Sequence, residues 1–211
     1  MTDRVVVFID YQNVKESARD VFFQPSDFHT RGQFDPLALG QVLASRQVTR
    51  RPRTLHQVRV YTGQPSSGRD PRGYGARQRQ IATWRRSPQV VVFPRALKYP
   101  PGWPQAGGEK PREKGVDVAL AVDFVALRIL GEYDVGIIFS SDTDLLPALE
   151  ASFKLLKTGD ELPEVACWGS PRTGRSRLQV SDQTMRCHWL DRQEFNRVAD
   201  STDYNIRKTT P

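Results

Sequence analysis

Two apolar segments of the chain end in acidic residues, and a third acid follows a long loop. Residues 5–9 (VVVFI) run directly into Asp10, and residues 135–139 (VGIIF) run into a polar segment that contains Asp142. Asp117 stands just after the sequence KGV, at the expected start of a helix. If the two segments are neighbouring parallel strands, their ends share the edge of the sheet where α/β proteins bind ligands. The three acids are therefore predicted to converge there.

The chemistry of three convergent carboxylates is limited by their charge. Each negative charge raises the pKa of the others, so all three stay ionised only beside cations. Mg²⁺ and Mn²⁺ prefer oxygen ligands and would relieve this repulsion. An ion held in this way can polarise a phosphate oxygen and supply a bound hydroxide, as phosphodiester hydrolysis requires. The acids thus indicate a hydrolytic site with Mg²⁺ or Mn²⁺ as its cofactor.

Each acid also has a structural interpretation. Asp10 could cap a following helix, and Asp117 could be a first-turn acid favoured by the helix dipole. Asp144 could be an N-cap, because Pro147 is tolerated only near the start of a helix. Asp123 lies six residues after Asp117, about 120° around a helix, so a salt bridge or solvent contact is its better interpretation.

The elements that must position these acids alternate between strands and helices. Strands are expected at 4–9, 54–61, 89–93, 134–140, 165–168 and 185–190. Helices are expected at 35–43, 74–86, 115–130, 145–156 and 191–198. This alternation predicts a mostly parallel sheet with helices on both faces. Irregular loops are expected at 63–75 and 94–113, with a frayed tail from residue 200 onward.

Basic residues are concentrated in one part of the chain. The whole sequence carries 31 Lys and Arg against 24 Asp and Glu, for a net charge of +7. Between residues 46 and 98, 13 basic residues accompany a single acid, Asp70, which leaves a local charge of +12 there and −5 elsewhere. Such a distribution favours a polyanionic partner beside a carboxylate site. A basic surface that only keeps the protein in solution is the alternative.

Several arginines of this basic segment are candidate nucleic-acid contacts. Guanidinium groups neutralise phosphates, and aromatic rings among them can stack on unpaired bases. The candidates are Arg72, Arg77, Arg79, Arg85 and Arg86. Tyr74 and Trp84 lie among them, although a core position is the better interpretation of Trp84. These side chains would bind RNA, single-stranded or structured, unless they only form a solvated face.

The sequence disfavours several other classes of protein. Its apolar stretches fall short of the roughly 20 residues that cross a bilayer, and its first residues lack the features of a secretion signal. Cys167 and Cys187 are too few for a disulfide scaffold and lack the spacing of a metal site. We therefore expect a protein of the reducing cytoplasm with no membrane partner.

Three motifs together carry a resemblance to a known family. The sequence reads FIDYQN at residues 8–13, KGVDVAL at 114–120 with Asp123 beyond it, and SSDTDL at 140–145. In this order the motifs resemble the NYN domain, in its LabA-like branch, which belongs to the PIN-like nuclease superfamily. The resemblance extends over roughly residues 4–170. The third motif usually reads SGDSDF, and the replacements here leave both of its acids in place.

The resemblance implies a fold and an activity. The family pattern implies a three-layer α/β/α sandwich with a mostly parallel central sheet, and metal-dependent RNA cleavage by clustered aspartates. Residues 1–198 would form a single domain of this kind, followed by a flexible tail at 199–211. The basic segment 46–98 and the loop 94–113 lie outside the core signature, so their roles rest on charge alone.

The resemblance also implies roles for individual residues. Asp10, Asp117 and Asp142 would be metal ligands, with Asp144 as a fourth acid. Asn13 would orient Asp10, unless it is only a turn residue. Further candidates are Lys114 as an RNA contact, and Asp123, Ser140 and Ser141 within the catalytic motifs.

A metal-dependent ribonuclease is therefore the predicted function. The alternative is an RNA-binding or regulatory module of the same fold, whose acids hold a cation without turnover. A phosphatase of the haloacid dehalogenase type is disfavoured, because Gln12 stands where that chemistry needs a second aspartate. Assembly into a homo-oligomer is left open.

Overall fold

The computed structural model of the chain describes residues 2–28, 30–46, 51–104, 108–170 and 177–206. The strands are β1 (Asp3–Asp10), β2 (Arg53–Gln64), β3 (Val90–Ala96), β4 (Val135–Phe139), β5 (Glu164–Trp168) and β6 (Arg186–Leu190). The helices are α1 (Tyr11–Phe22), α2 (Pro36–Ser45), α3 (Pro71–Trp84), α4 (Val116–Ile129), the 3₁₀ turn η1 (Thr143–Leu145), α5 (Leu146–Lys154) and α6 (Arg192–Val198).

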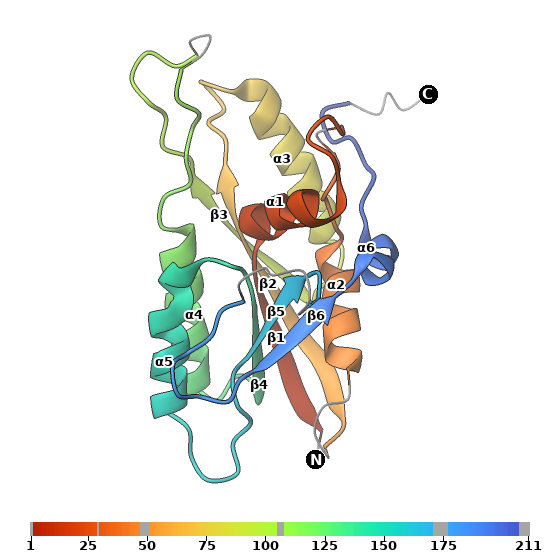
Figure 1. Ribbon diagram of the computed structural model, residues 1–211. Coiled ribbons are helices and arrows are strands. Elements are labelled where there is room, and N and C mark those ends of the chain that lie inside the picture. The colour runs from red at the N-terminus through yellow and green to blue at the C-terminus, as the bar shows by residue number, and fades with distance from the viewer. Residues whose placement is uncertain (1, 29, 47–50, 105–107, 171–176, 207–211) are drawn as a thin grey trace.

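The strands form one sheet in the order β3-β2-β1-β4-β5-β6, with every neighbouring pair parallel (Figure 1). The predicted α/β fold with a parallel central sheet is therefore confirmed. β1 lies between β2 and β4, so Val7 is opposite both Val58 and Ile137. Because all the strands run the same way, the carboxyl ends of β1 and β4 lie at the same edge of the sheet.

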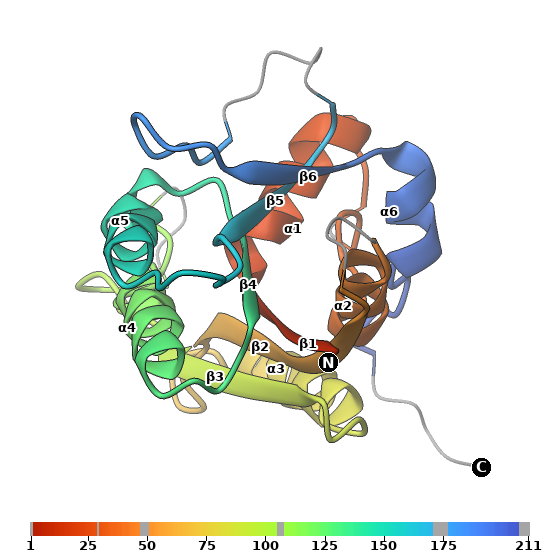
Figure 2. The same ribbon diagram turned by 90° about the horizontal axis from the view of Figure 1, so that it is seen from below.

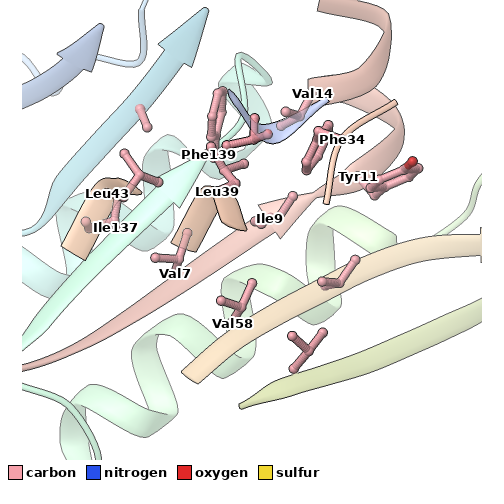
Figure 3. Close-up of a cluster of buried hydrophobic side chains, with 14 of the residues drawn as sticks. Val7, Ile9, Tyr11, Val14, Phe34, Leu39, Leu43, Val58, Ile137 and Phe139 are labelled. Carbon is pink, nitrogen blue, oxygen red and sulfur yellow. The ribbon is translucent and has the colours of Figure 1, made fainter. Parts of the chain in front are cut away.

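Helices cover both faces of the sheet. In β1, Val7 and Ile9 belong to the core shared with α1, α2, α3 and α6, while Val6 and Phe8 belong to the core shared with α4 and α5. Alternate residues of a strand point to opposite faces, which explains this division. Figure 2 shows α4 and α5 on one side of the sheet and α1, α2 and α6 on the other. Figure 3 shows Val7 and Ile9 among the side chains of the first core.

Helix α1 was not among the predicted helices, although its sequence carries a signal. Tyr11, Val14 and Ala18 are its buried residues, at a spacing that places them on one face of the helix. Asp10 is its N-cap, and the Asp10 carboxylate accepts a hydrogen bond from the backbone N–H of Asn13. The capping interpretation of Asp10 is therefore correct.

The segment expected to be a frayed tail folds back on the protein as far as residue 206. Tyr204 is 8% exposed, and its hydroxyl donates to Asp200 at 2.7 Å. Its carbonyl oxygen accepts two hydrogen bonds from the Arg79 guanidinium, at 2.6 and 2.8 Å. This segment therefore packs against α3, while residues 207–211 lie outside the described part of the chain.

The expected loop at 94–113 is partly regular. β3 continues as far as Ala96, and beyond it Lys98 and Arg112 pair as an antiparallel bridge with N–O distances of 2.8 and 3.0 Å. Residues 105–107 lie outside the described residues. Within the described part of the chain, no helix has the length and apolar content that crossing a bilayer requires.

Candidate active site

Asp10 lies at the centre of the candidate site. It is the last residue of β1 and is only 5% exposed, since α1 starts directly after it. Burial raises its pKa to about 7, and the negative charges of Glu113, Asp142 and Asp117 contribute to this rise. The hydrogen bond from the Asn13 backbone, at 3.3 Å, acts in the opposite direction. The predicted acids are thus close enough to repel one another.

The end of β4 supplies the second acid through a tight turn. The Asp142 carboxylate accepts from the backbone N–H of Asp144 at 3.0 Å and so caps η1. The hydroxyl of buried Ser140 accepts from the backbone N–H of Asp142 at 3.1 Å. The alternative interpretation of Asp144 as an N-cap is wrong, because Asp142 has this role and Leu145 precedes α5 without a side-chain cap. Asp144 is left exposed beside it.

Asn13 links the ends of β1 and β4. Its side-chain oxygen accepts from the backbone N–H of Ser141 at 2.9 Å and from the Ser141 hydroxyl at 3.0 Å. Its contact with Asp10 is made by the backbone N–H instead. The Asn13 side chain therefore positions the segment that carries Asp142, whereas the resemblance had implied that it orients Asp10.

Asp117 enters the site from the first turn of α4. Gly115 precedes this helix with a φ of +72°, a left-handed conformation in which glycine carries no steric cost. A β-carbon at Gly115 would also lie 3.2 Å from a guanidinium nitrogen of Arg95. The glycine of the KGVD motif therefore allows the turn that brings Asp117 toward Asp10.

Glu113 is a further acid of the site, which the sequence analysis did not identify. Its carboxylate accepts a hydrogen bond from the backbone N–H of Gly63, at the end of β2. Burial raises its pKa, with a contribution from Asp117, and this exceeds the lowering by the Gly63 hydrogen bond and by Arg77. In the sequence it is only the end of a proline-rich loop, so the pairing of that loop with β2 was needed to find it.

The acids of the site are suitable ligands for a hard cation, but their side chains are less suitably placed. All the acids of the site offer carboxylate oxygens, which Mg²⁺ and Mn²⁺ prefer. Within the described residues, however, no three acidic, histidine or cysteine side chains form a group that could hold a metal ion. A shared ion therefore requires the carboxylates to move closer together than the structure places them.

The predicted basic patch is divided between different surroundings. The Arg77 guanidinium lies 5.4 Å from the centre of the Tyr11 ring and donates to Gln80 at 2.7 Å. Burial lowers its pKa, against the opposing effect of Tyr11 and Glu113. Arg79 instead bonds to the chain at Tyr204. Arg77 therefore lies against Tyr11 and Gln80, near enough to Glu113 to be affected by its charge, while Arg79 contacts the segment around Tyr204.

The remaining basic candidates lie on the surface. Arg72, Arg86 and Lys114 are exposed, and so is Arg85, although its guanidinium donates to the Val92 carbonyl at 3.2 Å. They can meet solvent or a ligand, but they come from different ends of α3 and from the start of α4.

Asp123 lies away from the acid cluster. Its carboxylate accepts from the Arg59 guanidinium at 2.6 Å and from the Tyr61 hydroxyl at 2.7 Å. The salt bridge favoured by the helical spacing is therefore present. Asp123 links α4 to β2 and does not belong to the acid site.

Comparison with known proteins gives a family and a fold. The model of the NYN domain family matches residues 4–157, which is most of the chain. Among solved structures, the crystal structure of a Vibrio parahaemolyticus protein of unknown function is similar, with 18% sequence identity and a TM-score of 0.52. This similarity covers 90% of this chain and 94% of that chain, and at such identity it concerns the fold alone. No curated protein matches the chain.

Proposed function

The chain belongs to the NYN domain family, and on that premise we propose that it is a metal-dependent ribonuclease of the LabA-like branch. NYN domains group with the PIN-like nucleases, which act on nucleic acid. The observation that carries the proposal is the crowding of Asp10, whose pKa is raised to about 7 by burial and by three neighbouring carboxylates. Such a cluster is unfavourable when ionised unless a cation binds it.

Each residue of the site has a distinct part in this proposal. Asp10, Asp117 and Asp142 would hold the cation, which would polarise a phosphate oxygen and lower the pKa of a water molecule. Asp144 is exposed beside Asp142, where its carboxylate can accept a proton from the attacking water. Asn13 keeps the end of β4 at a fixed spacing from β1 through its two hydrogen bonds to Ser141.

A second candidate function is an RNA-binding or regulatory module without turnover. It is favoured by the finding that the described acidic side chains form no group of three that could hold a metal ion. In that case the acids would tune the local charge, and the exposed basic residues would bind RNA.

Incubation of end-labelled RNA with the protein in Mg²⁺, Mn²⁺ or EDTA tests the proposal. We expect cleavage with either metal and none in EDTA, and Asp142→Asn should abolish it. Asp182→Asn is the matched control: Asp182 is exposed at φ 59°, a conformation that asparagine adopts equally well. Cleavage that persists in EDTA would contradict the mechanism. RNA binding without cleavage in any metal would favour the regulatory module.

The compartment belongs to the same proposal. Both Cys167 and Cys187 are free thiols, with their sulfur atoms 3.3 Å apart. In the reducing cytoplasm that we propose for this protein, both thiols would stay reduced.

A further inference from the structure

The loop between β3 and α4 forms an arm that starts and ends beside the acids. We define the arm as the described residues 97–104 and 108–112. Leu97 at its start and Glu113 just after its end both pack on Gly63, where an added β-carbon would lie 2.4 and 2.6 Å from their side-chain atoms. The Lys98–Arg112 bridge closes the arm above this point. In Figure 1 the arm rises beyond the carboxyl ends of β2 and β3.

The arm holds two aromatic rings in a fixed arrangement. Tyr99 and Trp103 contact each other edge to face, with ring centres 4.9 Å apart. The Tyr99 hydroxyl accepts from the backbone N–H of Ser66 at 2.9 Å, which ties the arm to the loop after β2. The Arg69 guanidinium of that loop lies 5.5 Å from the centre of the Tyr99 ring. Both rings are only half-buried, so part of each remains open to a ligand.

The charges around these rings are mostly positive. Arg69 is exposed, and the segment from residue 95 to residue 114 carries five basic residues against two acids. One of those acids, Glu109, pairs with Arg112 at 3.2 Å, and the other, Glu113, faces the acid site. Lys98 and Lys110 are exposed. The surface of the arm therefore combines aromatic rings with a local excess of positive charge.

We propose that the arm binds single-stranded nucleic acid and leads it to the acids. Successive unpaired bases stack on aromatic side chains, while basic residues follow the phosphates, and a duplex does not offer its bases in this way. The arm starts and ends beside Gly63, which Glu113 of the site contacts, so a strand bound along the arm would end next to the acid cluster. The inference rests on the proposed function, because it names the form of substrate that the site would cleave.

Binding of a fluorescent RNA oligonucleotide in EDTA tests the arm without cleavage. We expect Trp103→Ala to weaken binding by at least about fivefold, which is the low end of the effect of removing one stacked base. Phe28→Ala is the matched control, since Phe28 is an exposed aromatic (77%) in a different loop, and it should bind like the wild type. Equal affinity of wild type and Trp103→Ala would overturn the proposal.

The charge of the arm is tested by salt titration. Replacing Lys98 and Lys110 by Ala should flatten the plot of log affinity against log salt by ~1.4, at ~0.7 for each phosphate that is no longer neutralised. Lys154→Ala with Lys157→Ala removes the same charge from exposed positions outside the arm and should leave the slope unchanged. Unchanged slopes for both double variants would contradict the proposal.

The form of the ligand is tested with the same oligonucleotide single-stranded and annealed to its complement. Tighter binding of the single strand by the wild type, with the difference reduced in Trp103→Ala, is the expected result. Equal binding of both forms would overturn the proposal. The two proposals can fail separately. Cleavage in Mn²⁺ together with unaltered RNA binding by the arm variants would contradict only the proposal about the arm. RNA binding that depends on the arm, without cleavage, would contradict only the proposed nuclease activity.

Discussion

At the scale of single residues, Asp10 has two roles with opposing effects on stability. As N-cap of α1 it accepts a hydrogen bond from the Asn13 backbone, which favours its ionised form. Burial and the acids around it favour the protonated form and raise its pKa from 3.8 to about 7. The second effect is larger, so an ionised Asp10 lowers the stability of the metal-free protein. An ionised carboxylate at this position is therefore destabilising, as expected of a functional residue.

This cost gives a prediction for Asp10→Asn in metal-free buffer. The unfolded carboxyl loses its proton near pH 4 and the folded one near pH 7, so the wild type should lose stability as pH rises through this window. The full difference in pKa corresponds to about 4 kcal/mol, reached above pH 7. Asparagine keeps the cap without the charge, so we expect the variant to be more stable than the wild type at pH 8 and similar at pH 4. Urea unfolding at both pH values measures this.

The same variant separates stability from activity. Asp10→Asn should lose RNA cleavage in Mn²⁺ while gaining stability in EDTA, because the removed charge is needed only when a cation is bound. Substantial unfolding of Asp10→Asn in EDTA would mean that the carboxylate is mainly structural, and the site assignment would fail.

At the scale of elements, strong apolar runs were predictable and the polar helix α1 was not. The strands around Val7 and Ile137 are continuous apolar segments, and their place in a parallel sheet follows from their alternation with helices. The polar sequence of α1 conceals three buried residues on one face. Glu113 joins the site through a hydrogen bond to Gly63, a contact across 50 positions of sequence that no local pattern reveals. The acids of the strand ends were thus predictable, and the one from the loop was not.

The segment after α6 also behaves as an element. Tyr204 is buried against α3, so Tyr204→Ala should lower the free energy of unfolding by roughly 2–4 kcal/mol, as for other large-to-small changes at buried positions. Tyr204→Phe is the control: it keeps the ring and loses the hydroxyl, whose hydrogen bond to Asp200 is worth about 1 kcal/mol. Thermal or urea unfolding measures both. If Tyr204→Ala were as stable as the wild type, the segment would be the frayed tail that its sequence suggests.

At the scale of the whole molecule, the two edges of the sheet differ in how their charges are compensated. At the carboxyl ends of β1 and β4 the acids repel one another and leave the pKa of Asp10 raised. At the amino ends, Glu164 of β5 accepts from Arg53 of β2 at 2.8 and 3.1 Å and contacts His188 of β6 at 2.6 Å. The sheet is therefore stabilised by ionic contacts at one edge and carries its functional charges at the other.

The stabilised edge gives the last prediction. Burial raises the pKa of Glu164, but its hydrogen bonds with His188 and Arg53 lower this pKa by a larger amount. The net pKa therefore lies below the ordinary value of 4.5. Its contribution to stability is therefore complete above the unfolded pKa and is lost as pH falls through the folded pKa. Glu164→Gln leaves Arg53 buried without its closest charge partner and should cost about 3–5 kcal/mol at pH 7. The difference from wild type should shrink below roughly pH 4.5, where the wild-type carboxyl also begins to lose its charge.

Glu161→Gln is the control, because Glu161 lies 3.9 Å from Arg53 and is more exposed than Glu164. This substitution should cost less than 1 kcal/mol, about the value of a weak ion pair. Urea unfolding between pH 3 and pH 8 measures both variants, and a Glu164→Gln difference that stays constant with pH would show that the glutamate acts by packing and not by charge.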